Sequence, residues 1–248
     1  MSVNKPLFYK QITALSRQKH SDLAYDNAHG YRFAQETNSV PVCVSEFAAA
    51  SRVYPIVFVI QNGVAAPVAV LGTQPQQNVW IDTEGHWLGD YVPAYVRRYP
   101  FISVRTSEHE STLCIDALSD TLNTNNEGIA LFDEQGDQSE FLKQRFQLAE
   151  AYETEMLRNK RLSSFLLEHD LLEPAQLNEK TENVKTVLSG FMVVSRARLE
   201  ALDKEVIAEL HQEGALELIY QHLFSLECFN SLAKKCSESN EVLAEGAA

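Results

Sequence analysis

Short apolar runs bounded by polar or turn residues follow one another along the first half of the chain, and this pattern predicts strands. The clearest runs are 54–61 and 66–72, with Asn62-Gly63 between them. Asn-Gly tolerates the positive φ angles that a type I′ turn needs, so this stretch predicts a β-hairpin. Further short runs lie at 101–105, 112–116 and 129–133.

After Gly136 the spacing of apolar residues changes to threes and fours, which predicts helices. Residues 137–157 carry one such stripe, and Pro174 is expected to end the helical region that follows. Residues 190–194 read as one more strand. A short helix is expected over 203–214, and a last long helix over 215–235.

These elements predict an α+β fold with a mostly antiparallel sheet in the N-terminal half, packed against C-terminal helices. We expect one domain over 1–248, because the apolar stripes of the helices need the sheet as a partner surface. Its sheet-rich part covers about 1–136, its helical part about 137–235, and a frayed tail about 236–248.

Charge and hydropathy narrow the classes of function. The 248 residues carry a formal net charge of −13. An acidic surface repels phosphate backbones, so nucleic acid is not an expected partner. The longest apolar run, 54–60, is far shorter than the ~20 residues of a spanning helix, so no membrane insertion is expected. The first residues lack the apolar core of a signal peptide, which predicts a cytoplasmic protein.

The cysteines favour a reduced protein without a metal site. None of the four cysteines forms a C-x-x-C pair. Cys228 and Cys236 are eight residues apart in a predicted helix, about 12 Å, which is too far for a disulfide. No two histidines have the i,i+4 spacing of a helical zinc site. We therefore expect free thiols and no metal or other cofactor.

Catalytic motifs are missing from the chain. There is no G-x-S-x-G nucleophile elbow and no glycine-rich nucleotide loop, so no catalytic residue is assigned. Asp82, Asp116 and Asp133 each close an apolar run. If strand ends met, the three carboxylates would suit a hard cation such as Mg²⁺. The simpler interpretation is that each aspartate stabilises a turn, and we favour it.

The segment 87–101, WLGDYVPAYVRRYPF, is the most distinctive stretch of the chain. Pro93 suits the first turn of a helix, and Pro100 disfavours helical geometry at Tyr99. The segment therefore predicts a short helix over about 92–98 that leads into a strand. On that helix Arg97 and Arg98 diverge by about 100°.

Two interpretations of this segment remain open. One arginine lying along the tyrosines and pairing with Asp90 or Glu46 would make a structural corner. Alternatively, the arginines would hold a carboxylate or phosphate and the tyrosines would stack on a planar group. A similar pattern, Arg52 followed by Tyr-Pro, precedes the strand at 56 and favours the structural interpretation. The candidate residues for ligand or partner binding are Arg52, Asp90, Tyr95, Arg97, Arg98 and Tyr99.

Several blocks of the sequence resemble the SapC family. They are EFAAASRVYPIVFV, NVWIDTEGHWLGDYVPAYVRRYPF, LCID, LFDEQG and ALDKEVIAELHQEGALELIYQHLFSL, in that order and over most of the chain. The resemblance implies a bacterial, mostly proteobacterial, source. The family is named for surface-layer protein systems, in which SapC accompanies secretion components. An unrelated peptide-transporter permease shares the name, and the missing membrane span argues against that reading.

The resemblance implies a soluble accessory or binding protein for a surface-protein or outer-membrane uptake system, with a protein partner and an oligomeric state left open. Other members resembling this chain are encoded beside tryptophan halogenases and TonB-dependent receptors. The alternative is therefore an enzyme, or a small-molecule-binding partner, in a pathway with a halogenase-like or oxygenase enzyme. The family supplies no established catalytic residues, so no site is carried over.

Overall fold

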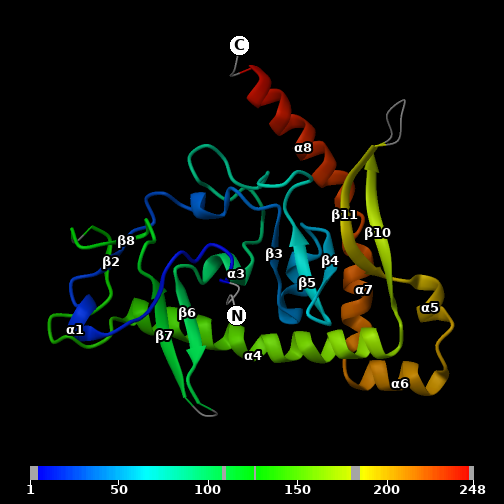
Figure 1. The fold of residues 1–248 in the computed structure, drawn as a ribbon, viewed down its shortest axis with the longest axis horizontal. Coiled ribbons are helices and arrows are strands. Elements are labelled where there is room, and N and C mark those ends of the chain that lie inside the picture. Colours follow the sequence, from blue (N-terminus) through cyan, green and yellow to red (C-terminus); the bar gives the residue numbers. More distant parts are fainter. Residues whose placement is uncertain (1–4, 108–109, 126, 180–184, 246–248) are drawn as a thin grey trace. The chain divides into compact units, whose positions relative to one another are not determined.

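The computed structural model describes residues 5–107, 110–125, 127–179 and 185–245 (Figure 1). The chain forms two compact units that interleave along the sequence. The first unit contains Met1–Ala34, Ile81–Trp87 and Ala94–Thr154, and the second contains the remaining segments. Helices and antiparallel strands occur in both, so the α+β class is confirmed.

Among its described residues, the first unit forms two three-stranded sheets. One has the order β1-β7-β6 and the other β8-β2-β9, and all their pairings are antiparallel. The strands are β1 (Ile12–Ala14), β2 (Ala24–Tyr25), β6 (Phe101–Arg105), β7 (Ser111–Asp116), β8 (Leu122–Asn123) and β9 (Ile129–Ala130). The helical elements are α1 (Arg17–His20), the 3-10 turn η1 (Arg32–Ala34), α3 (Ala94–Arg97) and the first part of α4 (Glu140–Glu168).

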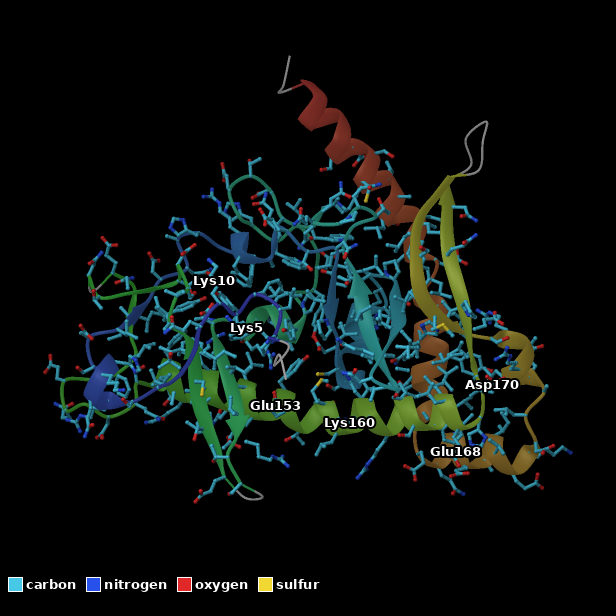
Figure 2. All side chains as sticks on the ribbon, viewed as in Figure 1. Lys5, Lys10, Glu153, Lys160, Glu168 and Asp170 are labelled. Carbon is cyan, nitrogen blue, oxygen red and sulfur yellow. The ribbon has the colours of Figure 1, made fainter. Side chains whose placement is uncertain are left out.

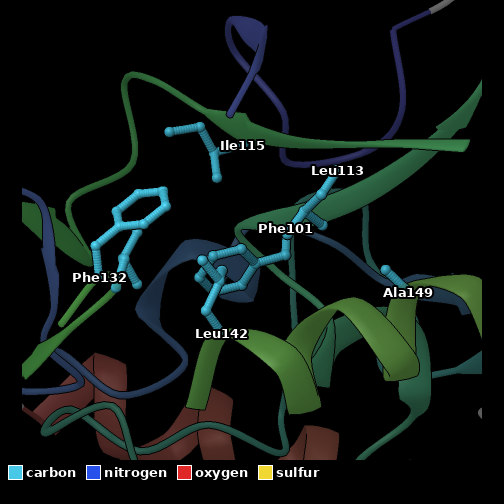
Figure 3. Packing of buried hydrophobic residues seen from close by; sticks show 7 residues of the cluster. Phe101, Leu113, Ile115, Phe132, Leu142 and Ala149 are labelled. Carbon is cyan, nitrogen blue, oxygen red and sulfur yellow. The ribbon is translucent and has the colours of Figure 1, made fainter. Parts of the chain in front are cut away.

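The core of the first unit lies between β6, β7 and α4 (Figure 3). Alternate residues of a strand point to one face, so Leu113 and Ile115 of β7 share the buried face. Leu142 and Ala149, seven residues apart, lie on one side of α4 and meet them around Phe101. This stripe of α4 was predicted from its spacing.

The second unit is built on one five-stranded antiparallel sheet of order β10-β11-β4-β5-β3. The strands are β3 (Ser39–Pro41), β4 (Ile56–Gln61), β5 (Val64–Val70), β10 (Leu172–Glu179) and β11 (Lys185–Val194). The helices are the 3-10 turn η2 (Val44–Glu46), α2 (Phe47–Ala50), α5 (Arg196–Glu200), α6 (Lys204–Gln212), α7 (Ala215–Ser225) and α8 (Cys228–Glu245), with the last part of α4.

The predicted hairpin is confirmed. β4 and β5 pair directly, and Asn62 and Gly63 between them have φ angles of 51° and 76°. Helix α6 is also confirmed, with Asp203 before it and Gly214, at φ 69°, after it.

Two predictions about the C-terminal half are wrong. Helix α4 ends at Glu168, and Pro174 lies inside strand β10, opposite Met192. A proline is tolerated there because β10 is the edge strand of its sheet. The last long helix is two helices, since the chain turns after Ser225. The Ser225 hydroxyl donates to the main-chain oxygen of His222, a local bond that competes with helix continuation.

A buried histidine joins helix α7 to the sheet of the second unit. The Nδ1 of His222 lies 2.8 Å from the oxygen of Ile56, and its Nε2 accepts the N–H of Val194 at 3.0 Å. Because Nε2 accepts, the proton of the neutral ring lies on Nδ1 and is donated to Ile56. In the described part of the chain, the ladder between β4 and β11 consists of the Met192–Phe58 pair, so His222 supplements a short ladder.

The predicted tail, 236–248, overlaps helix α8, which runs to Glu245; residues 246–248 lie outside the described part of the chain. That the whole chain is one domain remains a prediction, as does the fraying of its end.

Candidate functional site

The distinctive segment 87–101 folds locally as its prolines predict. Helix α3 starts directly after Pro93, and strand β6 starts directly after Pro100. The Tyr99–Pro100 peptide bond is cis. Residues 88–93 belong to the second unit and 94–101 to the first, so the site described next is built from the second part of the segment.

Arg98 is buried among tyrosine rings of the first unit. Its guanidinium carbon lies 4.2 Å from the ring centre of Tyr152, 4.4 Å from that of Tyr95 and 5.7 Å from that of Tyr9. These contacts fall within the range of favourable cation–π interactions. The side chain of Arg98 is only 4% exposed, so it fills the core of this corner.

The acid that pairs with Arg98 is Glu153, labelled on α4 in Figure 2. The two charged groups are 3.4 Å apart, and the Glu153 side chain is 41% exposed. Water screens such a pair, so the rings and not the ion pair provide most of the stabilisation. Glu46, which the sequence suggested as a partner, instead accepts the hydroxyl of Tyr91 and the N–H of Cys43.

A second buried polar group, Asp116, anchors Tyr99. The Tyr99 hydroxyl donates to Asp116 Oδ2 at 3.1 Å, and the same carboxylate accepts the main-chain N–H groups of Lys10 and Gln11 at 2.9 Å and 2.7 Å. The carboxylate therefore fastens the N-terminal segment to the end of β7. Burial raises the pKa of Tyr99, so its phenol stays protonated at neutral pH.

Arg97, the neighbour of Arg98 in the sequence, lies at the surface. It is exposed, and it lines a cavity of about 400 Å³ in the first unit, which we call the aromatic cavity. Arg145 of α4 lines the same cavity and donates from Nη1 to the main-chain oxygen of Arg97 at 3.3 Å. The remaining lining residues are Tyr25, Asn27, Tyr31, Phe33, Val96, Tyr99, Ile129 and Phe141.

The structure therefore divides the candidate residues into groups. Tyr95, Arg98 and Tyr99 lie in or beside the buried cluster, whereas Arg97 and one side of Tyr99 face the aromatic cavity. Arg52 and Asp90 are exposed residues of the second unit and join neither group within the first unit. The second Arg-then-Tyr-Pro pattern is similarly structural, since the buried Tyr54 donates its hydroxyl to the oxygen of Tyr91.

Sequence reasoning missed the residues that come from distant parts of the chain. Arg145 and Phe141 lie on α4, where their spacing indicates only a helix, and Tyr25 and Phe33 lie in short irregular elements near the N-terminus. Arg97 lies four residues before the end of the segment 87–101, and Arg145 lies 48 residues after Arg97, so no local signal indicates that the two residues meet.

The three aspartates do not gather into a cation site. Among the described residues, no group of three or more His, Cys, Asp or Glu side chains is placed to hold a metal ion. Asp82 accepts the N–H groups of Glu84 and His86, and Asp133 accepts that of Asp137, so the turn interpretation is confirmed for both. Asp116 accepts the N–H of Leu118 at 3.3 Å, so the turn interpretation holds there as well, and Asp116 is also the buried anchor of Tyr99.

The four cysteines are free, as predicted. Burial raises the pKa of Cys114 and Cys228, which disfavours the thiolate in both. The described helices include none that combines the length and the apolar character needed to cross a bilayer.

The fold is that of an α+β protein whose most distinctive segment builds a buried tyrosine–arginine corner beside an aromatic cavity. The chain belongs to the SapC family, whose model matches residues 15–232. No curated protein and no solved structure matches it.

Proposed function

We propose that this SapC-family chain is an accessory protein that acts in the bacterial cytoplasm by binding a protein partner, in the service of a surface-protein or outer-membrane uptake system. The family membership supports the setting. The observation that carries the proposal is the way in which the chain uses its most distinctive segment.

The tyrosines of that segment are engaged within the fold. Tyr91 donates to Glu46 at 2.8 Å, Tyr95 to the oxygen of Leu7 at 3.1 Å, and Tyr99 to Asp116 at 3.1 Å. A hydroxyl that is committed to an internal acceptor is poorly placed to exchange protons with a substrate. The most distinctive segment of the chain is thus explained by architecture, which favours binding over catalysis.

A surface of helix α7 suits a protein partner. Tyr220 and Phe224 are 42% and 65% exposed, and their rings stack with centres 6.2 Å apart. The exposed Glu217 lies three residues before Tyr220 on α7, and the exposed Glu227 lies in the turn after the helix, three residues after Phe224. We call these four residues the α7 patch. Aromatic residues are enriched at protein interfaces, and the glutamates favour a partner with an apolar groove and a basic rim.

The test is a pull-down of partner proteins from a gently lysed bacterial host. The bait is the tagged full chain, either as wild type or as the variant Phe224→Ser. Leu118→Ser is the matched control, because Leu118 is 54% exposed but lies in the other unit. We expect the wild type and the control to retain a component of a secretion, surface-protein or uptake system, and Phe224→Ser to lose it. A chain that emerges alone in all three experiments contradicts the proposal.

A second candidate function is favoured by the aromatic cavity. A chain that binds a small molecule would act as an enzyme, or as a ligand-binding partner of one, in a pathway with a halogenase-like or oxygenase enzyme. Arg97, which faces this cavity, is the residue of the distinctive segment that supports it.

A further inference from the structure

We propose that the aromatic cavity binds a small planar aromatic anion, whose charge is held by Arg97 and Arg145. This inference specifies the ligand of the second candidate function and is independent of the accessory role and of the α7 patch. Three properties of the cavity carry it: charge, ring surface and size.

The charge of the cavity is opposite to that of the chain. Among the described residues that line it, two are arginines and none is aspartate or glutamate, in a protein whose formal net charge is −13. The hydrogen bond from Arg145 to the main-chain oxygen of Arg97 holds the Arg145 guanidinium beside Arg97. Two guanidinium groups lining one cavity form a favourable site for a carboxylate or a similar anion.

Arg145 also has a hydrogen-bond donor that is unpaired in the described part of the chain. Its Nε is buried and has no hydrogen-bond partner in the described part of the chain, while Nη1 donates to Arg97. A buried N–H without an acceptor destabilises the structure, and an anion that reached it would remove that penalty. The guanidinium carbon lies 4.9 Å from the ring centre of Phe141, which limits the positions of the group.

The walls of the cavity include two stacked ring pairs. Tyr25 and Phe141 have ring centres 4.9 Å apart at 29°, and Phe33 and Tyr99 have centres 4.2 Å apart at 30°. Tyr25, Phe33 and Phe141 are only partly buried, although large aromatic rings usually contribute to stability by full burial. Partly exposed rings around a hollow favour a planar, apolar ligand body.

The polar groups of the cavity are compatible with an anion. Burial raises the pKa of Tyr25, so its phenol is neutral at pH 7, and it donates to Asn27 at 3.2 Å. The carboxylate of Asp26, which follows Tyr25 in the sequence, accepts the N–H of Ala28 at 2.9 Å. The volume of about 400 Å³ lies at the lower end of the range of small-molecule pockets, which suits a ligand of one or two fused rings.

The test measures binding of naphthalene-2-carboxylate to the full chain by isothermal titration calorimetry. Naphthalene-2-carboxamide has the same ring without the charge, and acetate has the charge without the ring. We expect saturable binding of the carboxylate, and binding at least about tenfold weaker for both comparison compounds, because a charge-assisted hydrogen bond is worth more than one decade in affinity.

Variants assign the binding to the cavity. Arg145→Gln and Arg97→Gln are each expected to weaken binding of naphthalene-2-carboxylate at least about tenfold. Arg105→Gln is the control, since Arg105 is an exposed arginine of β6 in the same unit and does not line the cavity. Arg97 is exposed, so its variant tests the proposal even if Arg145→Gln lowers the melting temperature.

Three outcomes overturn the inference: no saturable binding of naphthalene-2-carboxylate up to about 10 mM, equal binding of the carboxamide, or unchanged affinity in both cavity variants. None of them bears on the accessory role, because capture through the α7 patch is measured with Arg97 and Arg145 intact. Loss of capture in Phe224→Ser, conversely, leaves the titration unaffected.

Discussion

The guanidinium carbon of Arg98 lies 4.2 Å from the ring centre of Tyr152, which joins the residue after helix α3 to helix α4 within the first unit. Tyr95 and Tyr9 extend the aromatic surroundings of the same cation. Arg98 is thus a core residue of this unit despite its charge, and its neighbour Arg97 is a surface residue.

Arg98→Ala is expected to lower the free energy of unfolding by about 2–4 kcal/mol, because it removes the cation–π contacts and leaves a hollow among the rings. Glu153→Gln should lower it by less than about 1 kcal/mol, since the Glu153 side chain is 41% exposed. Urea denaturation of the two variants measures both losses in the free energy of unfolding. Arg97→Ala is the matched control and should differ little from wild type; equal losses for the two arginine variants would contradict a core role for Arg98.

The local part of this corner was predictable from the sequence, because prolines act on their immediate neighbours. Pro93 and Pro100 set the limits of α3 and β6, and helical geometry separates Arg97 from Arg98. Tyr152, Glu153 and Arg145 were not predictable as partners, because they lie about 50 residues away and their spacing on α4 indicates only a helix. Strand β10 was missed for a different reason: Pro174 ends a helix in most contexts, and only its position on a sheet edge makes it compatible with a strand.

Asp116→Asn tests the anchor of the N-terminal segment. The carboxylate is fully buried and accepts the N–H groups of Lys10 and Gln11 and the hydroxyl of Tyr99. An amide presents an NH₂ group to at least one of these donors, so we expect a loss of about 2–4 kcal/mol in the free energy of unfolding. Denaturation monitored by fluorescence measures the loss, with the exposed Asp133 changed to Asn as the control. An unchanged midpoint for Asp116→Asn would show that the anchor is dispensable.

Two glycines of the first unit face each other at close range. A Cβ on Gly30 would lie 2.3 Å from the oxygen of Gly85, and Gly30 has a φ of 54°. Gly30→Ala should therefore destabilise the protein by more than about 2 kcal/mol. Gly63→Ala is the control: Gly63 also has a positive φ, of 76°, but a Cβ there would meet no atom within 4 Å. The difference between the melting temperatures of the two variants measures the destabilisation that comes from the close approach at Gly30. Equal melting temperatures would contradict the expected clash with Gly85.

His222 should make stability depend on pH. Burial lowers the pKa of His222 to about 4, and the ring in the unfolded chain titrates near 6.5. Above pH 6.5 the ring is neutral in both states, so the contribution to stability is fully present. As the pH falls from 6.5 to 4, the unfolded state takes up a proton that the folded state excludes, and stability falls by about 3 kcal/mol.

Urea denaturation at intervals between pH 7.5 and 4 measures this slope, and His222→Asn is the variant that removes the titration. The variant should be less stable at pH 7, since the asparagine side chain is shorter than the bridge from Ile56 to Val194. Its slope between pH 6.5 and 4 should be smaller than that of wild type. His211→Asn, on the exposed part of α6, is the control and should keep the wild-type slope. If His222→Asn kept it as well, the acid sensitivity would have to come from the carboxylates, and His222 would not be the titrating group.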